Sequence, residues 1–245
     1  EKRSNSLWYF FSNAVALKDV FIVRKFVKWQ NAYVGKIDMW IDIVSDIDAI
    51  VSMSTFCFNH PEAKSAEVLD KNKVIFEAYN LYHPFLDETA VKNDFLIKDH
   101  DYYIITGANM AGKSTFLRTL GINYILAMMG MPVFADSLKI SQFNLFTSMR
   151  TTDDLTHGIS YFNAELLRLR QLISSLNGPT LIILDEILKG TNSLDKLNGS
   201  RLFLEYISEK NVTGVIATHD LELSKMSERY PDHFHNYCFE IELGT

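Results

Sequence analysis

The chain has 245 residues, of which 47% are hydrophobic and 22% charged, and its formal net charge is -6 at pH 7. This length and composition allow one large α/β domain and a smaller helical piece with a sizeable buried core. Acidic and basic residues are interspersed, so the overall charge gives no reason to expect a phosphate-rich polymer as the main partner. Any contact with nucleic acid is expected mostly outside this chain.

The first 60 residues are expected to form a small all-helical module. Residues 7–23 are apolar and aromatic, but Lys18 and Asp19 interrupt the run. A packed helix is therefore favoured over a membrane span, which needs about 20 predominantly apolar residues. From Ile37 onward, apolar residues recur every three or four positions with aspartates on the opposite face, which predicts one long amphipathic helix.

An Asn-His-Pro break at residues 59–61 divides the pattern. It predicts a helical module over residues 1–60 and a second domain over residues 61–245. In the second domain, apolar runs of strand length alternate with helical patterns, which predicts an α/β fold with a sheet covered by helices. The expected strands are residues 73–78, 102–106, 145–149, 180–184 and 212–217, and the expected helices are residues 113–128 and 161–176.

The two cysteines, Cys57 and Cys238, are far apart and lack metal-ligand spacing. This usage is typical of a reduced, cytoplasmic protein, and we expect both side chains to be buried as small hydrophobic groups. The chain begins without Met and without a cleavable signal pattern, so we expect it to be part of a longer protein.

A glycine-rich segment follows the strand expected at residues 102–106 and opens the next helix. It matches the pattern G-x-x-x-x-G-K-[ST], in which glycines let the loop wrap a phosphate while backbone amides and the helix N-terminus meet its charge. Lys113 is expected to reach the outer phosphates of a nucleotide, and the Ser114 hydroxyl to ligate Mg²⁺. A chance glycine-rich turn is the alternative, but the flanking strand and helix favour phosphate binding. The expected nucleotide-binding residues are Gly107, Ala108, Asn109, Met110, Ala111, Gly112, Lys113, Ser114 and Thr115.

Two later strands also end in polar residues. Asp185 and Glu186 close one apolar run; Asp185 is predicted to hold Mg²⁺ through its water shell, and Glu186 to orient and polarise the attacking water. His219 follows another run, where it could contact the γ-phosphate or that water. Solvated turn acids and an ordinary histidine are the alternatives, but the shared strand edge favours catalysis. We expect Mg²⁺-dependent ATP hydrolysis with Lys113, Glu186 and His219 as catalytic residues, and no other metal site.

These motifs resemble those of the MutS family of DNA mismatch repair ATPases. The resemblance extends from about residue 73 to the C-terminus, and more weakly to the helix around residues 46–52. The matching segments are residues 106–115 with an unusual Asn-Met pair in the phosphate loop, residues 158–165 with the family's Ser-Thr-Phe-x-x-Glu segment, residues 184–195 with its Walker B and D-loop run, and residues 217–219 with its switch histidine.

The resemblance implies a P-loop NTPase fold of the ABC ATPase type, preceded by the end of the MutS core helices. It also implies a head-to-tail homodimer that closes when ATP binds and is coupled to DNA through domains of the parent protein outside this chain. In such dimers Ser160 of one copy would contact the γ-phosphate bound by the other. From the residues alone, Ser160 is only a helix N-cap, and both roles are compatible.

The sequence departs from the family pattern at three places, one of which spans two residues. Ala111 replaces a usual glycine, which a position of negative φ accepts. Asp136 replaces a usual glutamine, which leaves the coupling of nucleotide to the rest of the protein open. Ala90 and Val91 lie where an aromatic adenine stacker is expected, so Tyr82 or His83 is the alternative contact for the base.

Other functions remain as alternatives. The chain could belong to a MutS paralogue with another duty, or to another ABC system; the latter predicts a Leu-Ser-Gly-Gly-Gln-like signature, whereas residues 160–162 are Ser-Tyr-Phe. A non-catalytic module that binds ATP without turnover is a third possibility; Glu186 and His219 argue against it, and Asp136 leaves it open.

Overall fold

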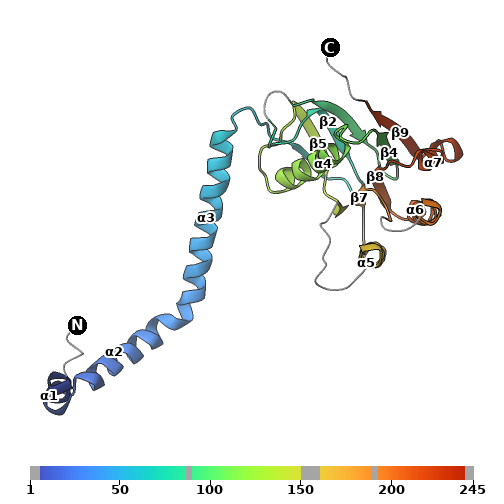
Figure 1. Cartoon of the computed structure of the whole chain (residues 1–245). Helices are drawn as coiled ribbons and strands as arrows, with labels where there is room; N and C mark the ends of the chain where they lie inside the picture. The colour runs from blue at the N-terminus through green and yellow to red at the C-terminus, as the bar shows by residue number, and fades with distance from the viewer. Residues whose placement is uncertain (1–5, 87–89, 150–160, 189–192, 241–245) are drawn as a thin grey trace. The chain divides into compact units, whose positions relative to one another are not determined.

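The computed structural model describes residues 6–86, 90–149, 161–188 and 193–240. Contacts between residues divide the chain into two units, residues 1–59 and residues 60–245. The described part of the first unit is helical, and the second unit combines helices with two β-sheets (Figure 1).

The described part of the first unit consists of α1 (Ser6–Ala16), α2 (Lys18–Tyr33), the 3-10 turn η1 (Val34–Lys36) and α3 (Ile37–Asn59). The prediction of a single helix over residues 7–23 is wrong, because Leu17 takes a left-handed φ of 45° between α1 and α2. Asn13 stabilises this break: its side chain accepts a hydrogen bond from the Asp19 N–H and donates one to the Asp19 carboxylate, both at 2.8 Å. No helix in the described ranges is long and apolar enough to cross a membrane.

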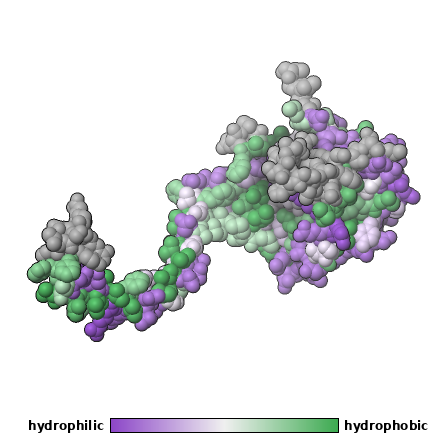
Figure 2. All heavy atoms as spheres, turned by 60° about the horizontal axis from the view of Figure 1, so that its bottom comes forward, coloured by the Kyte–Doolittle hydropathy of each residue, from purple (hydrophilic) through white to green (hydrophobic). Residues whose placement is uncertain are grey.

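The helices α2 and α3 carry many apolar side chains, yet none of their described residues is buried. Figure 2 shows such side chains exposed along these helices. Three rings contact one another in series, with centroids 6.3 Å apart for Trp29 and Tyr33 and 5.8 Å apart for Tyr33 and Trp40. The expected burial of Cys57 is wrong, because its helix has no covered face within the described part of the chain.

A five-stranded parallel sheet forms the centre of the second unit, in the order β6-β7-β8-β4-β9. Successive side chains of a strand point to opposite faces, so Ile104 and Ile105 join two different hydrophobic clusters. Both faces of the three central strands β7, β8 and β4 are buried, as is usual for parallel strands with continuous apolar sequences. The strands are β4 (Tyr102–Gly107), β6 (Asn144–Ser148), β7 (Thr180–Asp185), β8 (Val212–Ala217) and β9 (Phe234–Phe239).

Helices cover both faces of this sheet. On one side, Leu117 and Leu120 of α4 (Lys113–Met128) pack in the cluster that contains Ile105. The other cluster includes residues of α5 (Tyr161–Ser175), α6 (Ser193–Ser208), α7 (Leu221–Ser224) and α8 (Met226–Arg229). Each fully buried leucine stabilises such packing by about 1.5–3 kcal/mol. The packing holds the strand ends, and the loops that follow them, in fixed positions.

A second, four-stranded sheet lies on the α4 side, because its residues belong to the same hydrophobic cluster as α4. Its order is β1-β5-β2-β3, with β1 parallel to β5 and β2 antiparallel to both of its neighbours. Its strands are β1 (Glu67–Leu69), β2 (Phe76–Leu81), β3 (Asn93–Ile97) and β5 (Ser137–Ser141).

The strand predicted at residues 73–78 begins and ends three residues later, as β2. The backbone N–H groups of Val74 and Ile75 donate to the side chains of Asp99 and Ser141, both at 2.9 Å, instead of to a neighbouring strand. The apolar sequence before β2 is therefore an approach to the sheet, fixed by side-chain acceptors.

The predicted α/β fold with a parallel sheet is confirmed. Residues 212–217 and 113–128 are observed as β8 and α4, and the other strands and helix expected in the second domain, apart from β2, lie within two residues of their predicted bounds. The assignment to the ABC type and the domain boundary at residue 60 stay predictions.

Candidate functional site

The sheet brings the sequence motifs to one edge. β4 and β7 both lie beside β8, and Ala217, at the end of β8, is paired with Ile105 and with Asp185. The loops after the three strands therefore leave the same edge of the sheet, where open α/β sheets bind ligands. These loops carry the phosphate loop, residues 107–114, the acidic pair Asp185 and Glu186, and His219.

The phosphate loop has the backbone conformation that its glycines allow. Gly107 and Gly112 take φ values of 140° and 95°, and Met110 takes 64°. Ala111 is not among the described residues with positive φ, so alanine is accepted in place of glycine at this position. Helix α4 begins directly after Gly112, which points its first backbone amides toward the loop.

We predict that Gly107→Ala destabilises the fold. A Cβ at Gly107 would clash with the backbone carbonyl oxygen of Phe239 on β9, and φ is already in a region that side chains rarely adopt. The free energy of unfolding should fall by about 1–3 kcal/mol, measured by calorimetry. Gly35→Ala is the control, since a Cβ at Gly35 meets no atom within 4 Å. Equal unfolding temperatures for the two variants would contradict the argument.

Lys113 is the buried cation of the loop. Its side chain lies back over the turn, and Nζ donates hydrogen bonds of 2.8 Å to the backbone carbonyls of Gly107 and Ala108. The residue is only 6% exposed. Burial of a charged ammonium requires such acceptors, so the loop itself holds the cation in place for an anion.

A cavity of about 490 Å³, here called the phosphate cavity, opens beside the loop. The end of β7 and the loop after β8 contribute one residue each to its wall, so residues far apart in sequence meet there. The cavity is lined by Asn109, Met110, Ala111, Gly112, Lys113, Ser114, Thr115, Asp185 and His219. Seven of the expected nucleotide-binding residues, the expected metal ligands Ser114 and Asp185, and His219 are thus brought together.

Asp185 fits the role of a metal ligand. The residue is 5% exposed, and its Oδ2 atom is buried without a hydrogen-bond partner among the described residues. A buried carboxylate oxygen without a donor is costly unless a cation or water satisfies it. Together with the Ser114 hydroxyl in the same cavity, Asp185 forms an oxygen donor set of the kind that Mg²⁺ prefers.

Glu186 lies close to His219 but is not among the described residues that line the phosphate cavity. Its Oε1 is 3.1 Å from His219 Nε2, and its Oε2 is 4.0 Å from Lys196 Nζ on α6. Glu186 and Leu188 both have positive φ, 61° and 56°. The sequence predicted Glu186 and His219 as partners in one site, and the structure adds Lys196, for which no sequence pattern gave a signal.

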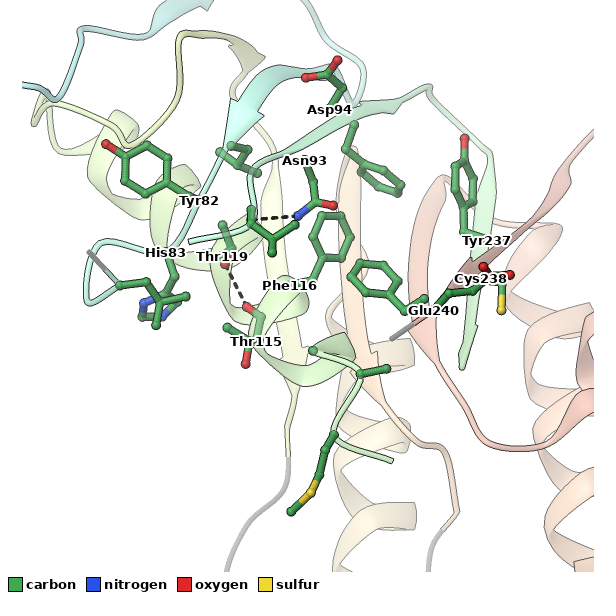
Figure 3. A pocket seen from close by; sticks show the side chains of 18 residues that line it. Tyr82, His83, Asn93, Asp94, Thr115, Phe116, Thr119, Tyr237, Cys238 and Glu240 are labelled. Atoms are coloured by element: carbon green, nitrogen blue, oxygen red, sulfur yellow. Dashed lines mark hydrogen bonds between the residues drawn. The ribbon is translucent and has the colours of Figure 1, made fainter. Parts of the chain in front are cut away.

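A second cavity of about 560 Å³, the aromatic cavity, adjoins the phosphate loop and shares Met110, Ala111, Gly112 and Thr115 with the first. Figure 3 shows Tyr82 and His83 along one side and Tyr237 and Cys238 along the other. Its further lining residues are Leu81, Leu86, Val91, Asn93, Asp94, Phe95, Phe116, Thr119, Phe239 and Glu240.

Both residues that the sequence suggested for base recognition line this cavity. Burial and, secondarily, the charge of Arg118 lower the pKa of His83 below its usual value, which favours the neutral ring. The Lys92 ammonium lies 4.9 Å from the centre of the Tyr82 ring. Val91 lines the cavity as well, without an aromatic ring to offer.

Sequence reasoning missed the contribution of β9 to the aromatic cavity. No motif marks this strand, which is placed beside β4 only by the sheet register, with Gly107 paired to Phe239. Cys238 is exposed, so its predicted burial is wrong; among the described strands, β9 lies at an edge of its sheet and pairs only with β4.

Asp136 lies directly before β5 of the second sheet and is not among the described residues lining either cavity. Its Oδ2 accepts a hydrogen bond of 2.7 Å from the Asn80 side chain, and its N–H donates to the carbonyl of Tyr79. Ser160, expected to act in trans, lies outside the described residues. Glu165 belongs to the segment, residues 158–165, that resembles the same family motif. It is buried, and its side chain accepts a hydrogen bond of 2.8 Å from the N–H of Leu188, two residues after Glu186.

Comparison with known proteins agrees with these motifs. The family model described as MutS domain V matches residues 103–243. The chain is similar to the DNA mismatch repair proteins MutS of Petrotoga mobilis (29% identity over 88% of this chain and 27% of that protein), Fervidobacterium nodosum (32%, 78% and 23%) and Acetivibrio thermocellus (35%, 72% and 21%). It thus spans about a quarter of the length of these curated relatives. The extent of the domain match shows that the chain belongs to the MutS family and carries its domain V.

Proposed function

We propose that this chain binds and hydrolyses ATP with Mg²⁺ at the phosphate cavity. The observation that supports this most strongly is the meeting of Lys113, Ser114, Asp185 and His219 around one cavity at the carboxyl edge of the parallel sheet. Catalysis of phosphoryl transfer depends on positioning and charge stabilisation. It therefore needs groups of these kinds: a cation, two oxygen donors for a metal and a polar ring near them.

The phosphate loop would bind the outer phosphates. Its backbone amides and the N-terminus of α4 carry partial positive charge, and Lys113 adds a full one. Ser114 and Asp185 would hold Mg²⁺, which supplies positive charge to the phosphates when bound. The adenine base would enter the aromatic cavity, where Tyr82 and His83 offer flat rings for stacking.

Glu186 would activate the attacking water. Its carboxylate can orient the water and accept its proton, and His219 would contact the γ-phosphate or the same water. The distance of 3.1 Å between Glu186 Oε1 and His219 Nε2 supports a role for both side chains at one water molecule, because the two groups lie next to each other. Ser160 of a second copy would contact the γ-phosphate and complete the site, so a homodimer is part of the proposal.

The parent protein would use this ATPase in DNA mismatch repair, as the names of the relatives suggest. ATP binding would close the dimer, and this closure would be coupled to DNA bound by other domains of the parent protein. The protein would act in the cytoplasm. The alternative within the same family is a MutS paralogue with a duty other than mismatch repair.

Asp185→Asn tests the proposal at its metal ligands. We expect ATP to bind the wild-type chain more tightly with Mg²⁺ than without it, and the variant to lose most of that difference, because a neutral amide holds a dication poorly. A metal-supporting carboxylate is worth roughly 10- to 100-fold in affinity. Isothermal titration with ATP, with and without Mg²⁺, measures the effect.

Asp232→Asn is the matched control, since Asp232 is exposed and lies outside the described lining of both cavities. The control should retain the full dependence on Mg²⁺. If the wild-type chain bound no ATP, or if Asp185→Asn kept the same dependence on Mg²⁺, the proposed site would be wrong.

A further inference from the structure

Both carboxylate oxygens of Glu186 face a positively charged or proton-donating group. Oε1 lies 3.1 Å from His219 Nε2, and Oε2 lies 4.0 Å from Lys196 Nζ. The second distance joins an ion pair without a direct hydrogen bond. The Glu186 side chain is only 12% exposed and that of Lys196 only 23%, so water screens the pair less than at an open surface.

The position of Lys196 is unusual for a lysine. It lies in the first turn of α6, where the helix dipole disfavours a positive charge. A carboxylate nearby offsets that effect, and Glu186 provides one. Glu186 is thus a carboxylate from outside α6 that lies near the Lys196 ammonium, in addition to Asp195 in the first turn of the helix itself.

Helix α6 is also packed against the segment that follows Glu186. The Ser200 hydroxyl donates to the backbone carbonyl of Ile187 at 3.5 Å, and a Cβ on Gly199 would come within 2.6 Å of the Leu188 side chain. Lys196 is therefore not a free side chain that reaches Glu186 by chance. It belongs to a helix that packs against Ile187 and Leu188, the residues directly after Glu186.

This arrangement directs the Glu186 carboxylate toward His219 and Lys196. Asp185, the preceding residue, lines the phosphate cavity, whereas Glu186 does not belong to its described lining. The backbone turns at Glu186 itself, with a φ of 61°, a conformation that costs a non-glycine residue about 1 kcal/mol or more and persists where surrounding contacts hold it. The contacts to His219 and Lys196 are such contacts.

We propose that Lys196 is a positioning residue that holds Glu186 in a resting state and slows ATP hydrolysis. The inference rests on the proposed function of Glu186 as the base. In hydrolysis the water oxygen bonds to the γ-phosphorus, the bond from that phosphorus to the β–γ bridging oxygen breaks, and a water proton passes to the Glu186 carboxylate. A carboxylate drawn toward an ammonium group is a poorer proton acceptor and is turned away from the water. Separation of α6 from Glu186 would release it.

Lys196→Met in the 245-residue chain tests this proposal, because Met preserves length while removing the charge. We expect kcat for ATP hydrolysis to rise about threefold to tenfold, the range that a modest ion pair accounts for, with KM for ATP unchanged. Lys196→Arg should hydrolyse ATP at the wild-type rate, because it keeps the positive charge. Lys210→Met is the charge-matched control: Lys210 is exposed, beyond the end of the same helix.

A double variant identifies the route of the effect. In the background of Glu186→Gln, Lys196→Met should leave the residual rate unchanged, because there is no carboxylate to release. A rate for Lys196→Met equal to or below that of the wild type, in a chain with an unchanged melting temperature and ATP affinity, would overturn the proposal, as would an equal acceleration in the Glu186→Gln background. Absence of ATP binding and turnover in the wild-type chain would instead refute the proposed function itself.

Discussion

Lys113→Ala should remove most of the affinity for ATP while leaving the chain folded. Nζ of Lys113 is held by two backbone carbonyls of the phosphate loop, at 2.8 Å each, and borders the phosphate cavity. A hydrogen bond to a charged group contributes about 1.5–3 kcal/mol, so loss of the ammonium should weaken binding by roughly 10- to 150-fold or more where it meets several phosphate oxygens. Isothermal titration with Mg-ATP measures the loss.

The control is Lys225→Ala, which removes a lysine from an exposed ion pair with Glu222. It should bind Mg-ATP as the wild type does. Circular dichroism would check that both variants are folded, since the Lys113 change also removes two hydrogen bonds from the loop. A folded Lys113→Ala variant with wild-type affinity would mean that the nucleotide binds elsewhere.

Glu186→Gln should separate binding from hydrolysis. The amide preserves the shape of the side chain but cannot accept the water proton. We therefore expect an ATP affinity close to that of the wild type and a turnover reduced by about 100-fold or more. Single-turnover hydrolysis with excess protein measures the rate. Glu228→Gln, an exposed glutamate on α8, is the control. If Glu186→Gln hydrolysed ATP at the wild-type rate, its assignment as the base would be wrong.

The same variant reports on the dimer. With ATP bound and not hydrolysed, Glu186→Gln should sediment as a dimer with Mg-ATP and as a monomer without it. Such a result would support the shared-site mechanism in which Ser160 acts in trans. A monomer at saturating nucleotide would shift weight toward dimerisation by domains of the parent protein, or toward a module that binds ATP without turnover.

The sequence by itself determined the central strands and the loops that follow them. Buried parallel strands need continuous apolar runs, and the phosphate loop needs glycines at fixed spacing, so both are visible as local patterns. From these patterns the meeting of Lys113, Ser114, Asp185 and His219 was predicted, because neighbouring parallel strands end at one edge. The start of α4 and the bounds of β8 were also predicted from local patterns, the phosphate-loop motif and an apolar run.

Only the tertiary structure decided which side chains cover which faces. The break at Leu17 depends on one left-handed residue and a side-chain contact between Asn13 and Asp19, which apolar periodicity does not encode. The aromatic cavity joins β2, α4 and β9, segments far apart in the chain, and the exposure of Cys238 follows from the edge position of β9.

The direction of Glu186 is the clearest case. The sequence identified the residue as a candidate base, but its contacts with His219 and Lys196 arise from the packing of α6 and β8 beside β7. A local pattern specifies the period of an element and the chemistry of its last residue. The orientation of a side chain at the end of a strand depends on the charges that distant segments bring near it, and these are fixed only when the core is packed.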